Sequence, residues 1–199
     1  MKNIKNFLNF DKEKNIFDYI YNEDMKSIKK YIDSGQDINI KNNSSYTPLR
    51  TACEYGSLEI IELLLSAGAN PDDRLSDGTT ALISAVCNNK ISIVKLLLES
   101  GANVDISDDT GDSALIYASF RNAEIVKLLL NYGADVNKQN KAGYTALSGA
   151  ISHNKIDIVK LLLNSGADVN KQCKDGRTTL FAAAFYNKYE IIKLLLDAG

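Results

Sequence analysis

A chain of 199 residues, of which 45% are hydrophobic and 24% charged, has enough apolar material for a folded core, which argues against a disordered protein. With a formal net charge of -2, the protein lacks the overall positive potential that dominates nucleic-acid binding, so we expect no nucleic-acid partner. The three cysteines, Cys53, Cys87 and Cys173, are too few and too scattered for a disulfide framework.

Residues 1–16 are the expected N-terminal tail. Charged residues recur every few positions in this tail, so it contains no apolar run of the length that a signal peptide needs. No other stretch approaches the apolar length of a membrane span. We therefore expect a cytoplasmic protein that does not contact a membrane, with secretion by another kind of signal as an alternative.

Residues 17–41 are expected to form a degenerate N-terminal capping unit that keeps the second of two helices. Gly35 closes that helix, and Lys29 and Lys30 place charge on it. Charge at this position suits a capping unit whose outer face meets water.

Residues 42–74 are the first complete unit, which we expect to contain two short antiparallel helices and a long loop. Thr47 begins the first helix, because its hydroxyl can accept a hydrogen bond from an unpaired backbone N–H of the first turn. Pro48 follows at a position whose N–H has no helical partner. Gly56 is expected to end this helix in a left-handed cap, and Gly68 closes the second helix.

The same pattern recurs in residues 75–107, 108–139, 140–172 and 173–199. The glycines that close the second helix are spaced by 33, 33, 32, 33 and 33 residues, at Gly35, Gly68, Gly101, Gly133, Gly166 and Gly199. A period of this length is typical of a solenoid, in which each unit buries its apolar face against its neighbours. The helix-opening hydroxyl recurs at Thr80, Ser113, Thr145 and Thr178. The first helix is expected to end in left-handed caps at Asn89, Asn122, Asn154 and Asn187.

Two of these units differ from the others. The unit at 108–139 is one residue short between its helices, which predicts a local change of twist. Its acidic stretch DISDDTGDS is interpreted as a loop rather than a calcium site, because Ile116 stands where a calcium loop needs a glutamate. The unit at 173–199 stops at Gly199 in mid-pattern, so we expect either an exposed edge or a fragment of a longer chain.

The stretches SSYTPL, DGTTAL and AGYTAL, each followed by a second helix of the type IVKLLL..GADVN, resemble ankyrin repeats. The resemblance covers five units over residues 42–199 and the degenerate unit before them. It implies an all-α solenoid of stacked helix-turn-helix units with protruding β-turn fingers. The family usually has histidine at the fourth place of its TPLH motif, where it helps to hydrogen-bond neighbouring loops. That place here holds Arg50, Ile83, Ile116, Ser148 and Phe181.

The sequence contains no phosphate loop, dinucleotide fingerprint, HExxH helix or nucleophile elbow. The single histidine, His153, has no recurring acid or nucleophile beside it and is interpreted as a surface residue. We therefore expect no enzyme, no catalytic residue, no cofactor and no metal.

Protein binding is the function that this pattern favours. The finger loops and the concave face of the first helices are free to vary, and aromatic and arginine side chains there are of the types enriched in interface hot spots. The alternative is that each ring covers the edge of a neighbouring unit and binds nothing. The predicted protein-binding residues are Tyr46, Tyr55, Asp77, Thr79, Asp112, Phe120, Arg121, Lys141, Tyr144, Arg177, Phe185 and Tyr186.

The leading functional hypothesis is a non-catalytic, monomeric scaffold for a protein partner of unknown identity. The alternative is a targeting or regulatory fragment of a longer protein, such as an enzyme or a secreted host-directed effector. A small-molecule site is a weaker third hypothesis, because nothing in the sequence indicates a closed apolar pocket.

Overall fold

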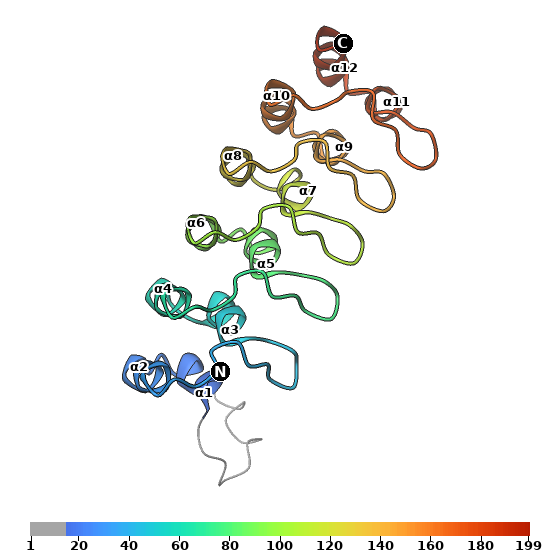
Figure 1. Ribbon diagram of the computed structural model, residues 1–199. Helices are drawn as coiled ribbons and strands as arrows, with labels where there is room; N and C mark the ends of the chain where they lie inside the picture. Colours follow the sequence, from blue (N-terminus) through green and yellow to red (C-terminus); the bar gives the residue numbers. More distant parts are fainter. Residues whose placement is uncertain (1–14) are drawn as a thin grey trace, which may run out of the picture. The chain divides into compact units, whose positions relative to one another are not determined.

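The computed structural model describes residues 15–199, which form twelve α-helices joined by turns and loops (Figure 1). Within this range, β structure is limited to two isolated bridges, between Ser107 and Ser113 and between Gln172 and Thr178. The chain divides into two compact units, Met1–Ala69 and Asn70–Gly199. The predicted all-α class of paired helices with finger loops is confirmed in both units.

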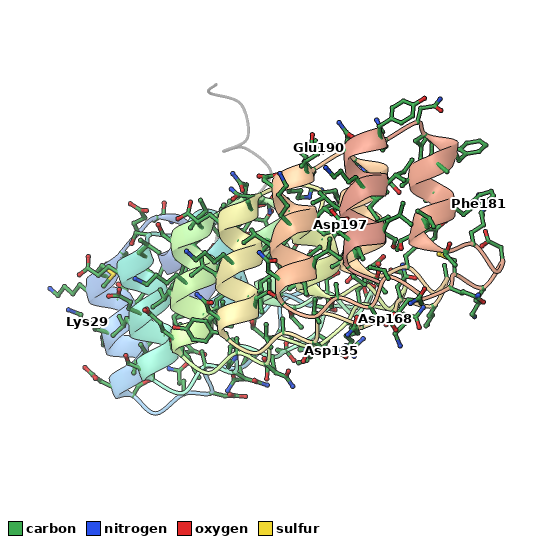
Figure 2. All side chains as sticks on the ribbon, turned by 90° about the horizontal axis from the view of Figure 1, so that it is seen from above. Lys29, Asp135, Asp168, Phe181, Glu190 and Asp197 are labelled. Atoms are coloured by element: carbon green, nitrogen blue, oxygen red, sulfur yellow. The ribbon has the colours of Figure 1, made fainter. Side chains whose placement is uncertain are left out.

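The first compact unit contains two helix pairs. They are α1 (Ile16–Tyr21) with α2 (Met25–Asp33), and α3 (Pro48–Tyr55) with α4 (Leu58–Ser66). α1 packs against α2 and α3, and α3 packs against α4. The segment before residue 42 therefore has a short first helix as well as the second helix that the sequence pattern indicated. Lys29 and Lys30 on α2 are exposed, and Lys29 is labelled in Figure 2.

The second compact unit contains four helix pairs. They are α5 (Ala81–Cys87) with α6 (Ile91–Glu99), α7 (Ala114–Ala118) with α8 (Ala123–Asn131), α9 (Ala146–Ser152) with α10 (Ile156–Asn164), and α11 (Thr179–Phe185) with α12 (Tyr189–Asp197). The first helices of these pairs stack in the order α5, α7, α9, α11, and the second helices in the order α6, α8, α10, α12. The finger loops of this unit project on the side of its first helices (Figure 1). Apolar residues at helical spacing, such as Val159 and Leu162, are completely buried between the two rows.

In the five complete units, the start of the first helix is set by a hydroxyl side-chain cap, as predicted. In all five cases the hydroxyl accepts a hydrogen bond from the backbone N–H three residues further on, at Thr47, Thr80, Ser113, Thr145 and Thr178. Such a cap contributes about 1 kcal/mol to helix stability. Five caps at one register position therefore determine where each first helix begins.

The predicted left-handed ends of the first helices are confirmed at three positions. Asn89, Asn154 and Asn187 have φ values of 54°, 55° and 54°. The prediction is wrong at Gly56, which has φ -91° and ψ 174°. The Gly56 N–H still bonds to the Ala52 carbonyl oxygen at 2.8 Å, so the helical pattern runs to its end and the chain leaves it extended. A Cβ at this position would lie 3.0 Å from that oxygen, so a larger residue would require a small local shift of the backbone.

The prediction is also wrong at Asn122, which has an extended φ of -143° and begins α8 instead of ending α7. Its side-chain oxygen accepts hydrogen bonds from the N–H groups of Glu124 and Ile125. This unit is one residue short, and α7 is correspondingly only 5 residues long. The missing residue is thus absorbed by an early end of α7. The predicted change of twist at this unit stays a prediction.

Candidate functional site

Each finger loop is closed by a tight turn whose chemistry is visible in the sequence. In the fourth complete unit, the Asn140 N–H donates to the Tyr144 carbonyl and the Gly143 N–H donates to the Asn140 carbonyl, both at 2.9 Å. The Asn140 side chain accepts the Tyr144 N–H at 2.9 Å. Gly143 has φ 85°, a left-handed conformation that glycine adopts without strain. The finger is therefore held in one conformation by its own hydrogen bonds.

Neighbouring fingers of the second compact unit are joined by backbone hydrogen bonds. The Asp109 N–H donates to the Asp77 carbonyl, Lys141 to Thr110, and Lys174 to Ala142, at 2.9, 3.0 and 3.0 Å. The fingers approach so closely that a Cβ on Gly143 would lie 2.8 Å from the Cα of Cys173. These bonds connect neighbouring loops without the TPLH histidine that the sequence lacks.

A second set of hydrogen bonds between neighbouring units joins loop residues outside the finger turns. The side-chain oxygens of Asp72, Asp105 and Asn137 accept the backbone N–H of a residue in the next unit, at 2.8, 3.0 and 2.7 Å. Two of the donors, Asp135 and Asp168, are labelled in Figure 2. Sequence reasoning missed this network. Its signal was available, because an Asp or Asn recurs with the repeat period at these positions.

Two predicted site residues, Phe120 and Arg121, lie in an aromatic cluster at the end of α7. The Phe120 ring centroid is 6.3 Å from that of Tyr117 and 4.8 Å from that of His153, which belongs to the next unit and stacks on it. The Arg121 guanidinium lies 5.2 Å from the Phe120 ring centroid. Phe120 is half-buried and Arg121 is exposed. Phe120 therefore has packing partners within the chain, and Arg121 is the more accessible of the two.

The acidic finger at residues 108–112 is held together by its own carboxylates. The Tyr117 hydroxyl donates to Asp108 Oδ2 at 2.7 Å, and Thr110 and Asp112 also donate to this carboxylate. Burial alone would raise the pKa of Asp108, but these hydrogen bonds together hold it below its usual range. Burial, followed by the bond to Asp108, raises the pKa of Tyr117.

Asp112, a predicted site residue, has both carboxylate oxygens engaged within the chain. Oδ1 accepts from the Asn140 amide at 2.7 Å, and Oδ2 lies 2.8 Å from the Thr110 hydroxyl, whose single proton it shares with Asp108 Oδ1 at 2.6 Å. The acidic stretch thus forms a finger turn. No group of three or more His, Cys, Asp or Glu side chains that could hold a metal ion occurs within residues 15–199.

Four predicted residues, Tyr144, Arg177, Phe185 and Tyr186, come together around one pocket between the last two units. The pocket lies against α9 and α11 and the fingers in front of them, and its volume is about 60 Å³. Binding sites for drug-sized ligands span about 300–1,000 Å³, so this volume argues against the small-molecule hypothesis.

The lining residues that sequence reasoning missed include Phe181 and Lys171. Phe181 is 50% exposed and lies on the side of α11 away from α12 (Figure 2). The corresponding residues of three earlier units, Ile83, Ile116 and Ser148, are buried, so the repeat pattern indicated a packing position. An aromatic residue where the three preceding units have an aliphatic or small one was the available signal.

Several polar groups of this pocket already have partners within the chain. The hydroxyls of Ser148, Ser152 and Thr179 donate to backbone carbonyls. Burial, with a further contribution from Asp175, raises the pKa of the Cys173 thiol, so it stays protonated at neutral pH and is a poor nucleophile. These groups line the pocket.

Arg177, at the rim of the pocket, is paired with its neighbour in the finger. Its Nε donates to Asp175 Oδ2 at 2.7 Å, and a second guanidinium nitrogen forms an ion pair with the same oxygen. The bond from Arg177 lowers the pKa of Asp175, and the bond to Asp175 raises the pKa of Arg177. The pair leaves the rim with no net charge from these two residues.

Two predicted residues belong to the first compact unit. Tyr46 follows the finger turn and is half-buried, with the Arg50 guanidinium 5.3 Å from its ring centroid. Tyr55, at the end of α3, is exposed, and its ring centroid lies 5.1 Å from that of Tyr21. A hydrogen bond with Glu54 raises the pKa of Tyr55. Both rings therefore contact a neighbouring side chain and still present an open side.

Three further predicted residues lie on the fingers of the second compact unit. Asp77 is exposed and accepts the Thr79 N–H at 2.9 Å, a bond that lowers its pKa. Thr79 is half-buried, and Lys141 is exposed. Asp77 and Thr79 thus form part of the turn itself, whereas the Lys141 side chain extends from it.

Comparison with protein families supports the resemblance seen in the sequence. A family model described as ankyrin repeats (three copies) matches residues 16–108, 68–140, 93–173 and 115–199. The crystal structure of an ankyrin repeat domain from Acinetobacter baumannii AYE superposes with a TM-score of 0.87 and 31% sequence identity. That superposition covers 92% of this chain and 97% of the bacterial chain.

Two curated relatives match shorter segments. An ankyrin repeat protein of Fowlpox virus (strain NVSL) is 40% identical over 74 residues, which are 37% of this chain and 10% of the viral protein. BCL-6 corepressor-like protein 1 of Homo sapiens is 39% identical over 54 residues, 27% of this chain and 3% of the human protein. The matched segments thus span a tenth or less of these relatives. Separately, none of the helices within residues 15–199 combines the length and apolar character needed to cross a membrane.

Proposed function

Because this chain belongs to the ankyrin repeat family, we propose that it is a non-catalytic scaffold that binds a protein partner. Ankyrin repeats are generally protein–protein interaction modules and generally have no catalytic activity. The partner would contact the finger loops and the adjoining face of the first helices. The residues proposed for this contact are the twelve predicted from the sequence, together with Phe181 and Lys171.

The observation that carries this proposal is the rigid presentation of exposed side chains by the finger loops. Hydrogen bonds between Asp77 and Asp109, Thr110 and Lys141, and Ala142 and Lys174 hold neighbouring fingers together. A surface that is ordered before binding loses little conformational entropy on docking. Tyr144 is 41% exposed on this preformed surface, so its ring is not part of the core and is accessible to a partner.

The proposal includes a monomer in the cytoplasm. No pair of cysteines in this chain has the spacing of a redox motif, which suits a reducing compartment. The apolar side chains that hold the stack together, such as Leu97, Leu129 and Leu162, are buried within the chain and are not available for a second copy.

A pair of photo-crosslinking variants tests the proposal. Tyr144 and Tyr132 are almost equally exposed, at 41% and 42%, but Tyr144 follows a finger turn and Tyr132 follows the second helix α8. A benzoylphenylalanine at position 144, expressed in the source cells, is expected to cross-link one or a few proteins that mass spectrometry identifies. The same group at position 132 is the control and should cross-link none of them.

The identified protein, purified, should then bind the unmodified chain in solution. Equal cross-linking from both positions, or a cross-linked protein that shows no binding in purified form, would contradict the proposed surface.

A further inference from the structure

We propose that the pocket between the last two units binds one aliphatic side chain of an acidic, extended segment of a partner protein. This inference rests on the proposed function and specifies the partner's chemistry at one site. In this inference the aliphatic side chain, called the anchor below, enters the pocket. The carboxylates that flank it in the partner pair with the lysines around the pocket.

The size of the pocket limits its occupant to a single side chain. Its volume is about 60 Å³, whereas an apolar cavity that holds benzene measures about 150 Å³. The tip of a valine, leucine or isoleucine fits this space. A segment of protein that inserts one such side chain is therefore favoured over a free ligand.

The walls of the pocket favour an apolar occupant. The rings of Phe181 and Phe185 are stacked with centroids 6.2 Å apart, and Tyr186 meets Phe185 edge-on at 5.2 Å. Phe181 and Phe185 remain 50% and 69% exposed. The hydroxyls of Ser148 and Ser152 already donate to backbone carbonyls, so these donors need no polar partner from a ligand. An aliphatic group would cover exposed aromatic surface without breaking the hydrogen bonds of these two hydroxyls.

The charges around the pocket determine what flanks the anchor. The finger segments 140–144 and 173–177 carry three cations and one anion, whereas the segments 74–79 and 108–112 carry four anions and one cation, Arg74, which is paired with Asp109. Among residues 15–199, the ammonium groups of Lys141, Lys171 and Lys174 have no ion-pair partner. Carboxylates are thus attracted to the last two units and repelled from the two before them. This asymmetry makes the acidic segment specific for one end.

An extended backbone matches this arrangement of pocket and lysines. Successive side chains of an extended segment point to opposite sides, so one aliphatic residue can enter the pocket while neighbouring carboxylates stay outside it. Lys171 lines the pocket itself, and Lys174 lies on the finger in front of it. Both can therefore reach carboxylates close to the same anchor.

The test is a selection from a random peptide library displayed on phage, with the intact chain immobilised through biotin at its amino terminus. The recovered peptides are expected to share a valine, leucine or isoleucine flanked by aspartate or glutamate. A synthetic copy of the most frequent peptide is then measured against variants by fluorescence anisotropy. We expect Lys171→Glu and Lys174→Glu each to weaken its binding at least about fivefold. Phe181→Ala should weaken it by a similar factor, because it removes a wall of the pocket.

Two controls separate this inference from the proposed function. Lys127→Glu makes the same change of net charge on an exposed position of α8 and should leave peptide binding unchanged. Each variant should also keep the thermal midpoint of the original chain, because the substituted side chains are outside the core. Basic or uncharged consensus peptides, no consensus, or peptides insensitive to the three substitutions would overturn the inference. The cross-linking result at Tyr144 would still decide the proposed function.

Discussion

The hydroxyl of Tyr117 on α7 donates a hydrogen bond of 2.7 Å to Asp108 at the start of the finger loop of the same unit. The bond ties a helix to its finger, and it joins a neutral donor to a charged acceptor. Because Asp108 also accepts from Thr110 and Asp112, one carboxylate organises the whole turn.

Replacing Tyr117 by phenylalanine is therefore expected to lower the free energy of unfolding by about 1 kcal/mol at neutral pH. This is below the usual range for a bond to a charged group, because Tyr117 is only half-buried. The folded-state pKa of Asp108 is depressed, so its stabilisation is present above the ordinary aspartate pKa and is lost as pH falls through the depressed value. Urea unfolding at neutral pH and in acid measures this. If the original chain and Tyr117→Phe differ as much in unfolding free energy in acid as at neutral pH, the bond to the carboxylate is not the cause of the difference.

Leu162 is a core residue with no exposed surface, and its truncation to alanine should cost about 2–5 kcal/mol of stability. Leu196, which is 63% exposed on α12, offers the same substitution outside the core. Leu196→Ala should change stability by no more than about 0.5 kcal/mol. Thermal and denaturant unfolding of the two variants compare burial directly, and similar losses would mean that the core is not where the helix rows place it.

Gly143 and Gly166 distinguish two reasons why a glycine recurs in the repeat, namely a left-handed backbone and a close contact with the neighbouring finger. Both have φ 85°, but a Cβ on Gly143 would lie 2.8 Å from the Cα of Cys173, whereas a Cβ on Gly166 meets nothing within 4 Å. Gly166→Ala should cost about 1 kcal/mol from the left-handed backbone alone. Gly143→Ala should cost clearly more, since neighbouring fingers must also move apart. Equal losses of unfolding free energy would show that the finger contact is loose in solution.

Asn137 connects two units through both ends of its amide. Its oxygen accepts the Asp168 N–H at 2.7 Å, and its nitrogen donates to the Gly166 carbonyl at 3.1 Å. Asn137→Ala should destabilise the protein by about 1–2 kcal/mol through the loss of these bonds. Asn170, the corresponding residue one unit later, is exposed and has neither of these bonds, so Asn170→Ala is the matched control. Calorimetry compares the loss of unfolding free energy in Asn137→Ala with that in Asn170→Ala. Hydrogen exchange at the Asp168 amide should accelerate only in Asn137→Ala.

Local chemistry was sufficient to predict most of the fold. The hydroxyl caps, the finger glycines and the apolar positions at helical spacing each depend on residues a few places apart, and each recurs with the period of the repeat. A signal repeated in five units is stronger than any one copy of it. Prediction failed at two ends of first helices. Asn122 lies in the unit that is one residue short, where it begins α8 in an extended conformation. Gly56 has the ordinary spacing of the repeat, and its extended conformation had no signal in the pattern.

The candidate site depended much more on the tertiary structure. Phe120 and Phe185 occupy the same register position and are the same residue type, yet His153 of the next unit stacks on Phe120 while Phe185 is 69% exposed. No local pattern distinguishes these two rings. The same is true of the pocket, which is formed by side chains from two fingers and two first helices. Periodicity specifies how each unit folds, because that depends on contacts within the unit. Exposure depends on what the neighbouring unit places against a side chain, and only the folded stack decides it.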